Sequence, residues 1–145
     1  MLYTNNTVKA MNLLFERQKD QKDKRGCPYV FHPFHVAEQM DDENSIVVAL
    51  LHDIVEDTDT TFEELEQMGF NKEVLDALHL LTHEEGVDYF DYVQEIAKNP
   101  LATKVKLADL EHNMDPTRLN EITEKDIKRR EKYQKAYTFL SQKNK

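Results

Sequence analysis

The sequence predicts an all-α fold, a single helical bundle of about seven or eight helices. Three observations lead to this fold class. Apolar residues recur at helical spacing along most of the chain. The alternation of apolar and polar residues that is typical of half-buried strands is sustained nowhere. Only 3 glycines and 4 prolines occur in 145 residues, which disfavours a turn-rich β sandwich or barrel. A chain of this length fits one domain, so we expect residues 1–145 to share one core.

The first half of the chain is predicted to hold four helices. They are residues 5–19, a helix that starts near Pro33, residues 44–54, and a short helix that begins at Thr60 or Thr61 and ends at Gly69. Residues 20–28 are charged and contain Gly26 and Pro28, so they are predicted to form a loop. The helix over 44–54 is apolar on almost every side, which is typical of a helix buried at the centre of a domain.

The second half is predicted to hold four more helices, because each has a recognisable capping residue at its start. The expected starts are Asn71, Asp88, Asn99 followed by Pro100, and Thr123 with Asp126. The last helix should reach about Leu140 and is amphipathic and basic. It could pack on its own domain or on a second copy of the chain, so a homo-oligomer stays open.

The charge of the chain argues against some partners. The formal net charge is −9, whereas affinity for nucleic acid comes mainly from Lys and Arg. From Glu38 to Gln67 there is no Lys or Arg, and carboxylates are dense. Most of these carboxylates are expected on solvated helix faces, yet such density also favours a bound cation. We therefore expect no nucleic-acid partner.

Other features predict the cellular setting. No apolar run approaches the roughly 20 residues of a membrane span. The N-terminus lacks the basic and apolar regions of a signal peptide. One cysteine, Cys27, excludes an intrachain disulfide and a cysteine-based zinc cluster. We expect a cytoplasmic protein that does not bind membranes.

The segment ALLHDIVEDTDTT, residues 49–61, carries the strongest chemical signal. A buried apolar helix ends there in His52 and Asp53, and an aspartate in such a place normally has a partner. Glu56 and Asp57 follow four positions after them and would share their faces if the helix continued. The plainer alternative is a histidine that interacts with the helix dipole, followed by a solvated acidic tail.

Two further segments add candidate ligands. His32 lies in PYVFHPFHV, where a lone histidine in apolar company is more often a core residue than a ligand. Asp109 lies in KVKLADLEHNM, on a helix otherwise suited to burial. A buried carboxylate needs a compensating partner, so we expect a cation beside it. The remaining histidines, His35, His79, His83 and His112, are expected on helix faces or at a pocket rim.

Taken together, GCPYVFHPFHVA, ALLHDIVEDTDTT and VKLADLEHNM resemble the HD superfamily of metal-dependent phosphohydrolases. More narrowly, they resemble the hydrolase domain of RelA/SpoT-type alarmone enzymes and the stand-alone small alarmone hydrolases. The similarity runs from about residue 22 to residue 119. It implies one divalent metal, usually Mn²⁺, on His32, His52, Asp53 and Asp109.

The resemblance also implies the roles of other residues. Glu56 and Asp57 match the catalytic acidic pair, which orients or deprotonates the attacking water. Asn113 matches a residue that contacts the sugar, and Lys106 matches a further family position. Lys22, Lys24 and Arg25 are expected at the outer phosphates, flanking Asp23, which stands where the family carries an arginine against the guanine.

The expected activity is therefore hydrolysis of a small nucleotide. The leading candidate is removal of the 3′-pyrophosphate of ppGpp, which yields GDP and pyrophosphate. One alternative is an HD-class nucleotidase or phosphodiesterase that acts on another nucleotide. A second alternative is a non-catalytic nucleotide-sensing module, against which the presence of both Glu56 and Asp57 argues.

Overall fold

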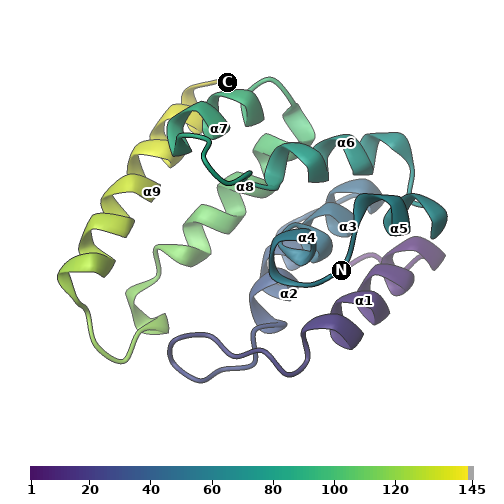
Figure 1. Ribbon diagram of the computed structural model, residues 1–145, viewed down its shortest axis with the longest axis horizontal. Helices are drawn as coiled ribbons and strands as arrows, with labels where there is room; N and C mark the ends of the chain where they lie inside the picture. Colours follow the sequence, from purple (N-terminus) through teal and green to yellow (C-terminus); the bar gives the residue numbers. More distant parts are fainter. Residues whose placement is uncertain (144–145) are drawn as a thin grey trace.

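The computed structural model describes residues 1–143, which fold into an all-α bundle, as predicted (Figure 1). This part of the chain contains nine α-helices, one short 3-10 helix and no strand. The helices are α1 (Asn5–Gln18), α2 (Phe31–Glu38), α3 (Glu43–Leu51), α4 (Ile54–Asp57), α5 (Phe62–Gln67), α6 (Lys72–Leu81), α7 (Tyr89–Ile96), α8 (Pro100–Asn113), η1 (Pro116–Arg118) and α9 (Glu124–Lys143). None of these helices is long and apolar enough to cross a membrane.

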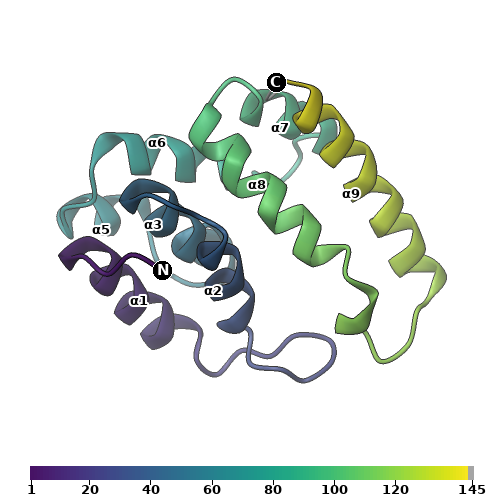
Figure 2. The ribbon, with the colours of Figure 1, turned by 180° about the vertical axis from the view of Figure 1, so that it is seen from behind.

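Helix α3 is the centre of the bundle. It contacts α1, α2, α6 and α8, and its residues from Ser45 to Leu51 are all buried. This confirms the prediction that the nearly all-apolar helix lies in the core. Helix α8 packs against α2 and α3 on one side and against α9 on the other, and Figure 2 shows it running between them. The polar groups on α8 are thereby brought close to the carboxyl end of α3.

Several of the predicted helix starts are confirmed by side-chain caps, whereas α2, expected to start near Pro33, begins at Phe31 without one. Asn71 accepts a hydrogen bond from the amide of Val74, and Asn99 accepts one from the amide of Ala102. Asp88 caps α7 in the same way. Thr61, one of the two candidates, caps α5. These short polar residues satisfy amide groups that have no partner within the helix, so each of the capped helices begins where such a residue stands.

One predicted helix is divided in two. The sequence predicts a single helix over residues 44–54, whereas α3 ends at Leu51 and the one-turn helix α4 begins at Ile54. Asp53, between them, has φ −106° and ψ −2°, well away from the values of about −63° and −42° that a regular α-helix has. In a continuous helix the side chains of His52 and Asp53 would diverge by about 100°. The break lets both of them reach the same point.

Candidate metal centre

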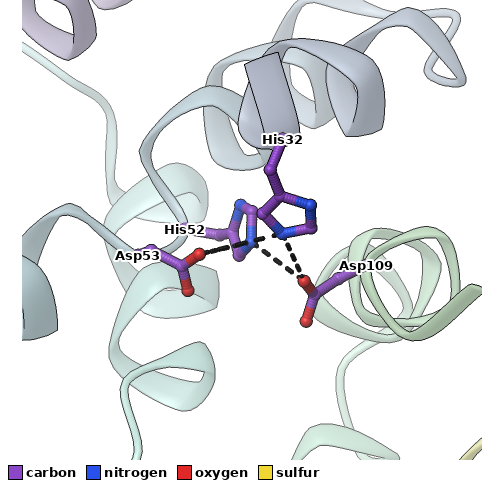
Figure 3. A group of neighbouring side chains, drawn as sticks. All are labelled: His32, His52, Asp53 and Asp109. Carbon is purple, nitrogen blue, oxygen red and sulfur yellow. Dashed lines mark hydrogen bonds and ion pairs between the residues drawn. The ribbon is translucent and has the colours of Figure 1, made fainter. Parts of the chain in front are cut away.

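Four side chains from separate parts of the chain converge at the carboxyl end of α3 (Figure 3). His32 comes from the first turn of α2, His52 caps the end of α3, Asp53 precedes α4, and Asp109 lies on α8. One ligand atom from each residue lies within 4.8 Å of the other three. The structure thus brings together the four residues that were predicted from the sequence to be metal ligands.

The facing atoms are two imidazole nitrogens and two carboxylate oxygens. His32 Nε2 lies 2.8 Å from Asp109 Oδ1, and His52 Nε2 lies 3.2 Å from the same oxygen. His52 Nε2 is also 3.1 Å from Asp53 Oδ2. His32, His52 and Asp109 are buried, so these polar atoms have little access to water. A cluster of this kind needs positive charge at its centre.

The outer nitrogen of each imidazole has its own partner. His52 Nδ1 lies 2.5 Å from the carbonyl oxygen of Ala49, which can only accept, so Nδ1 carries the proton in this contact. His32 Nδ1 lies 2.7 Å from Nδ1 of His112. Both rings therefore turn Nε2 toward the carboxylates, which is how histidine ligands are commonly held.

The ionisation of the cluster shows how strongly it attracts cations. Burial alone would raise the pKa of Asp109, but the Lys106 ammonium and His52 outweigh it and hold that pKa well below its usual range. Burial acts to lower the pKa of His52, yet Asp53 and Asp109 raise it well above its usual value. Without an ion, the carboxylates thus draw a proton onto His52. Two imidazoles and two carboxylates also suit a divalent ion such as Mn, Fe, Co or Zn, so the residues fit a metal.

Glu56 and Asp57 lie on α4, one turn beyond the ligands. The amide of Asp57 donates to the carbonyl oxygen of Asp53 over 3.0 Å, so α4 follows directly from the ligand pair. Partial burial, together with the charges of Asp53 and Glu56, raises the pKa of Asp57 to about 6. Partial burial also raises the pKa of Glu56, whose Oε1 accepts a hydrogen bond from the amide of His83. A carboxylate with a pKa near 6 is well matched to proton transfer near neutral pH.

Lys106 and Asn113 both bind the ligand Asp109. Lys106 Nζ lies 2.9 Å from Asp109 Oδ2, and its side chain is 12% exposed. Asn113 Nδ2 donates to Asp109 Oδ1 over 3.0 Å. Arg118 in turn donates to Asn113 Oδ1 over 3.0 Å. Lys106 and Asn113, both predicted to bind substrate, thus fix the orientation of the candidate metal ligand Asp109.

The three basic residues of the loop before α2 lie farther out. Lys24 Nζ pairs with Asp126 Oδ1 of α9 at 2.9 Å, and Arg25 donates to the carbonyl oxygen of Leu119 over 3.2 Å. Lys22 forms an isolated bridge with Pro28. None of these contacts joins them to the four-residue cluster.

A cleft of ≈ 380 Å³ adjoins the cluster, and Arg25, Phe31, His32 and Arg118 are among its lining residues. Its charged lining is mixed, because Asp23 and Glu38 also line it and Arg118 lies 3.8 Å from Asp23 Oδ2. A larger groove of ≈ 1020 Å³ lies elsewhere, along α7 and α9, and its lining is mostly apolar and includes no His or Asp. Of these two cavities, only the smaller cleft is lined by a residue of the four-residue cluster.

Tyr29 was not among the residues predicted for the site. The Tyr29 hydroxyl donates a hydrogen bond to Asp53 Oδ2. Its position three residues before His32, in the same motif, was the signal that could have identified it. His112 lines the cleft, as expected of a residue at a pocket rim, and it also contacts His32. His79, by contrast, is exposed and stacks on Phe62, as expected of a helix-face residue.

Comparison with known proteins finds curated relatives named as guanosine-3′,5′-bis(diphosphate) 3′-pyrophosphohydrolases and, at similar identity, as GTP pyrophosphokinases. The chain is 31% identical over 128 residues to the guanosine-3′,5′-bis(diphosphate) 3′-pyrophosphohydrolase MESH1 of Drosophila melanogaster, which covers 81% of this chain and 71% of that protein. It is 36% identical over 109 residues to the Homo sapiens MESH1, covering 68% of this chain and 60% of the relative.

A guanosine-3′,5′-bis(diphosphate) 3′-pyrophosphohydrolase of Aquifex aeolicus is 33% identical over 113 residues. The aligned part is 70% of this chain but only 16% of that much longer protein. No protein-family model matches the chain. Among solved structures, a metazoan ortholog of SpoT superposes with a TM-score of 0.79 at 23% identity, covering 97% of this chain and 87% of the other. That likeness independently supports the helical fold.

Proposed function

Because this chain belongs to the family of guanosine-3′,5′-bis(diphosphate) 3′-pyrophosphohydrolases, we propose that it hydrolyses ppGpp to GDP and pyrophosphate. The observation that carries the proposal is the convergence of His32, His52, Asp53 and Asp109 on one point. This cluster lies beside a cleft in which the guanidinium groups of Arg25 and Arg118 would meet a nucleotide phosphate. A buried set of imidazoles and carboxylates next to such a cleft is suited to phosphate-ester hydrolysis.

The four clustered residues are proposed to hold one divalent metal, Mn²⁺ by family preference. When bound, such an ion draws charge from the phosphoryl oxygens and makes water a better nucleophile. The chain contributes the orientation of the ligands. Asp53 is held by the hydroxyl of Tyr29, and His52 is held by the carbonyl oxygen of Ala49. Asp109 is held by Lys106 and Asn113. Ligands fixed in this way need no rearrangement to accept the ion.

Glu56 and Asp57 are proposed as the catalytic acidic pair. Asp57, with a pKa of about 6, can accept a proton from the attacking water near neutral pH and release it again after turnover. Glu56 is held in place by the amide of His83 and would orient that water. Both residues belong to α4, so the break after α3 places the ligands and the proton acceptors on consecutive turns.

The remaining polar residues are proposed to bind the nucleotide. Asn113 is exposed and would contact the ribose, while Lys106 adds positive charge behind Asp109. Arg25 lines the cleft and would meet the outer phosphates. Lys22 and Lys24 belong to the same loop, but the ammonium of Lys24 is already paired with Asp126. Arg25 is therefore the strongest candidate of the three.

A turnover assay tests this proposal. Purified protein with Mn²⁺ should release pyrophosphate from ppGpp, in a panel that includes other guanosine and adenosine nucleotides. Asp53→Ala should lose bound metal and turnover together. Glu56→Ala should keep the metal and lose rate, which separates binding from catalysis. If neither pyrophosphate nor phosphate is released from any nucleotide of the panel, the proposal is wrong. Binding of ppGpp without turnover, at full metal occupancy, would instead favour a nucleotide-sensing module.

One observation favours a second candidate, an HD-class nucleotidase or phosphodiesterase that acts on a nucleotide with another base. Asp23 stands at the position where the family carries an arginine against the guanine. Its Oδ1 accepts hydrogen bonds from the amides of Arg25, over 3.0 Å, and Cys27, over 2.9 Å, so it shapes the loop itself. The product distinguishes the candidates, because a nucleotidase would release inorganic phosphate from a monophosphate.

The proposed compartment is the cytoplasm, where the free thiol of Cys27 would stay reduced.

A further inference from the structure

The contact between His32 and His112 differs from an ordinary aromatic stack. The two ring planes are parallel within 4°, and the ring centroids are 5.0 Å apart. The nearest ring nitrogens, Nδ1 of each residue, are only 2.7 Å apart. Because the planes are parallel, the distance between them cannot exceed the 2.7 Å between these two nitrogens. Stacked rings need about 3.5 Å between their planes, so stacking is excluded. The rings therefore meet edge to edge, with one nitrogen pointing at the other, in the geometry of a hydrogen bond.

A hydrogen bond between two imidazole nitrogens requires one donor and one acceptor. If Nε2 of His32 faces a metal ion, that nitrogen must offer its lone pair, and the ring proton must be on Nδ1. Figure 3 shows the second ring nitrogen of His32 turned away from the cluster, which is the side from which His112 approaches. Nδ1 of His112 is then the acceptor. Among the described residues, His112 supplies the hydrogen-bond partner of this nitrogen.

From this geometry we infer that His112 is a positioning residue for the metal centre, which accepts the Nδ1 proton of His32 and thereby directs its Nε2 lone pair to the ion. The inference rests on the metal centre of the proposed function. For His52 the same task is performed by a backbone carbonyl, that of Ala49. The two candidate histidine ligands thus have different hydrogen-bond partners. Only the partner of His32 is a side chain, so only that hydrogen bond can be removed by a substitution.

The surroundings of His112 hold its ring in the required plane. The ring of His35 stacks on it at 4.1 Å between centroids, with 27° between the planes. Arg118 Nη1 donates to the carbonyl oxygen of His112 over 3.3 Å, at the end of α8. The ring is therefore fixed by His35 from one face and by the backbone, and its Nδ1 cannot easily turn from His32.

A matched pair of variants tests the inference. Asn and Leu have nearly the same shape, but the Asn side-chain oxygen can accept a hydrogen bond near the place of Nδ1, whereas Leu cannot. The Mn²⁺ dissociation constant of each variant would be measured by competition with a fluorescent chelator, without any nucleotide. His112→Leu should weaken Mn²⁺ binding by about 10- to 100-fold, the usual effect of losing such a partner. His112→Asn should recover most of that loss.

Two controls separate positioning from general damage. His35→Phe keeps a flat ring against His112 and should bind Mn²⁺ like the wild type. The melting temperature of each metal-free variant reports whether the fold is intact, and His112→Phe, which keeps the ring, replaces His112→Leu if the latter does not fold.

The outcomes distinguish this inference from the proposed function. Wild-type affinity in His112→Leu or His112→Phe, or an equal loss in His112→Asn, would overturn the role of His112 and leave the metal centre standing. A wild-type protein that binds no divalent ion would overturn both.

Discussion

Lys106 and Asp109, one turn apart on α8, form an ion pair in the interior, with Nζ 2.9 Å from Oδ2. The Lys106 ammonium also lies 5.3 Å from the centre of the Tyr92 ring, which adds to its stabilisation. Burial would lower the pKa of Lys106, but Asp109 and the neighbouring phenols raise it well above its usual value. The lysine therefore stays charged and balances one carboxylate whether or not a metal is bound.

The first prediction concerns the loss of that charge. Lys106→Met should destabilise the metal-free protein by about 2 kcal/mol. This is less than the roughly 3–5 kcal/mol that follows loss of one partner from a buried pair, because Asp109 keeps its contacts with His32 and Asn113. Added Mn²⁺ should raise the melting temperature of the variant more than that of the wild type, since the ion replaces the missing charge. Thermal unfolding with and without Mn²⁺ measures both effects.

The matched control is Lys104→Met, on the same helix. Lys104 is 38% exposed and pairs with Asp41 at the surface, where ion pairs contribute about 0–1 kcal/mol. Equal destabilisation by the two substitutions would contradict the assignment of Lys106 to the buried site.

The second prediction concerns the pH dependence that Asp57 causes. Its pKa of about 6 in the metal-free protein is above the ordinary value of 3.8, so the folded state binds its proton more tightly than the unfolded state. Between these values the folded state holds more protons, and the contribution of Asp57 to stability therefore falls as the pH rises from about 4 to about 6. Asp57→Asn should remove this contribution in denaturant titrations of the metal-free protein over that range.

Turnover should change in the opposite direction. Asp57 accepts a proton only when ionised, so the rate should rise with pH until the group is deprotonated, at or below about pH 6 because a bound cation favours the carboxylate. The initial rate against pH, in wild type and Asp57→Asn, checks this. An unchanged acidic limb in Asp57→Asn would show that another group controls it.

The third prediction concerns the hydroxyl of Tyr29. Tyr29→Phe removes the hydrogen bond to Asp53 Oδ2 and leaves this ligand freer to rotate. Mn²⁺ affinity should fall by about tenfold, and the free energy of unfolding should fall by about 1 kcal/mol. Calorimetric titration with Mn²⁺ and denaturant unfolding measure the two quantities.

Tyr92→Phe is the control for this effect. The Tyr92 hydroxyl donates to the carbonyl oxygen of Leu81 over 2.7 Å and makes no hydrogen bond to the four clustered residues, while Tyr92→Phe keeps the ring beside Lys106. Loss of this hydroxyl should lower the free energy of unfolding by a similar amount but leave the affinity for Mn²⁺ unchanged. If both variants bind Mn²⁺ equally, Tyr29 has no special part in the site.

The parts of the fold that depend on local chemistry could be predicted from the sequence. Asn71, Asp88 and Asn99 start helices because a short polar side chain satisfies amides within one turn. The break between Leu51 and Ile54 could not be predicted in this way. It depends on partners from α2 and α8 that hold His52 and Asp53, and a helical periodicity contains no information about them.

Some residues of the candidate site could likewise be predicted from the sequence, and others could not. The four clustered residues are recognisable because buried histidines and carboxylates are unusual in an apolar setting. Tyr29 was not predicted for the site, because composition and periodicity do not show where its hydroxyl points. Lys24 was expected at phosphates, but its ammonium pairs with Asp126, 102 positions later in the chain. Contacts between such distant residues appear only in the folded structure.

The last prediction separates the two basic residues of that loop. Arg25 lines the cleft beside His32. Within residues 1–143 its guanidinium makes one hydrogen bond, to the carbonyl oxygen of Leu119, which leaves other donors to meet a phosphate. Arg25→Met should therefore raise the KM for the nucleotide by about tenfold, the usual effect of losing one charged hydrogen bond. Lys24→Met should leave KM nearly unchanged and lower the melting temperature slightly, because it frees α9 from the loop. Steady-state kinetics of both variants show which of the two residues binds the nucleotide. A larger rise of KM in Lys24→Met would mean that the ion pair with Asp126 opens to admit substrate.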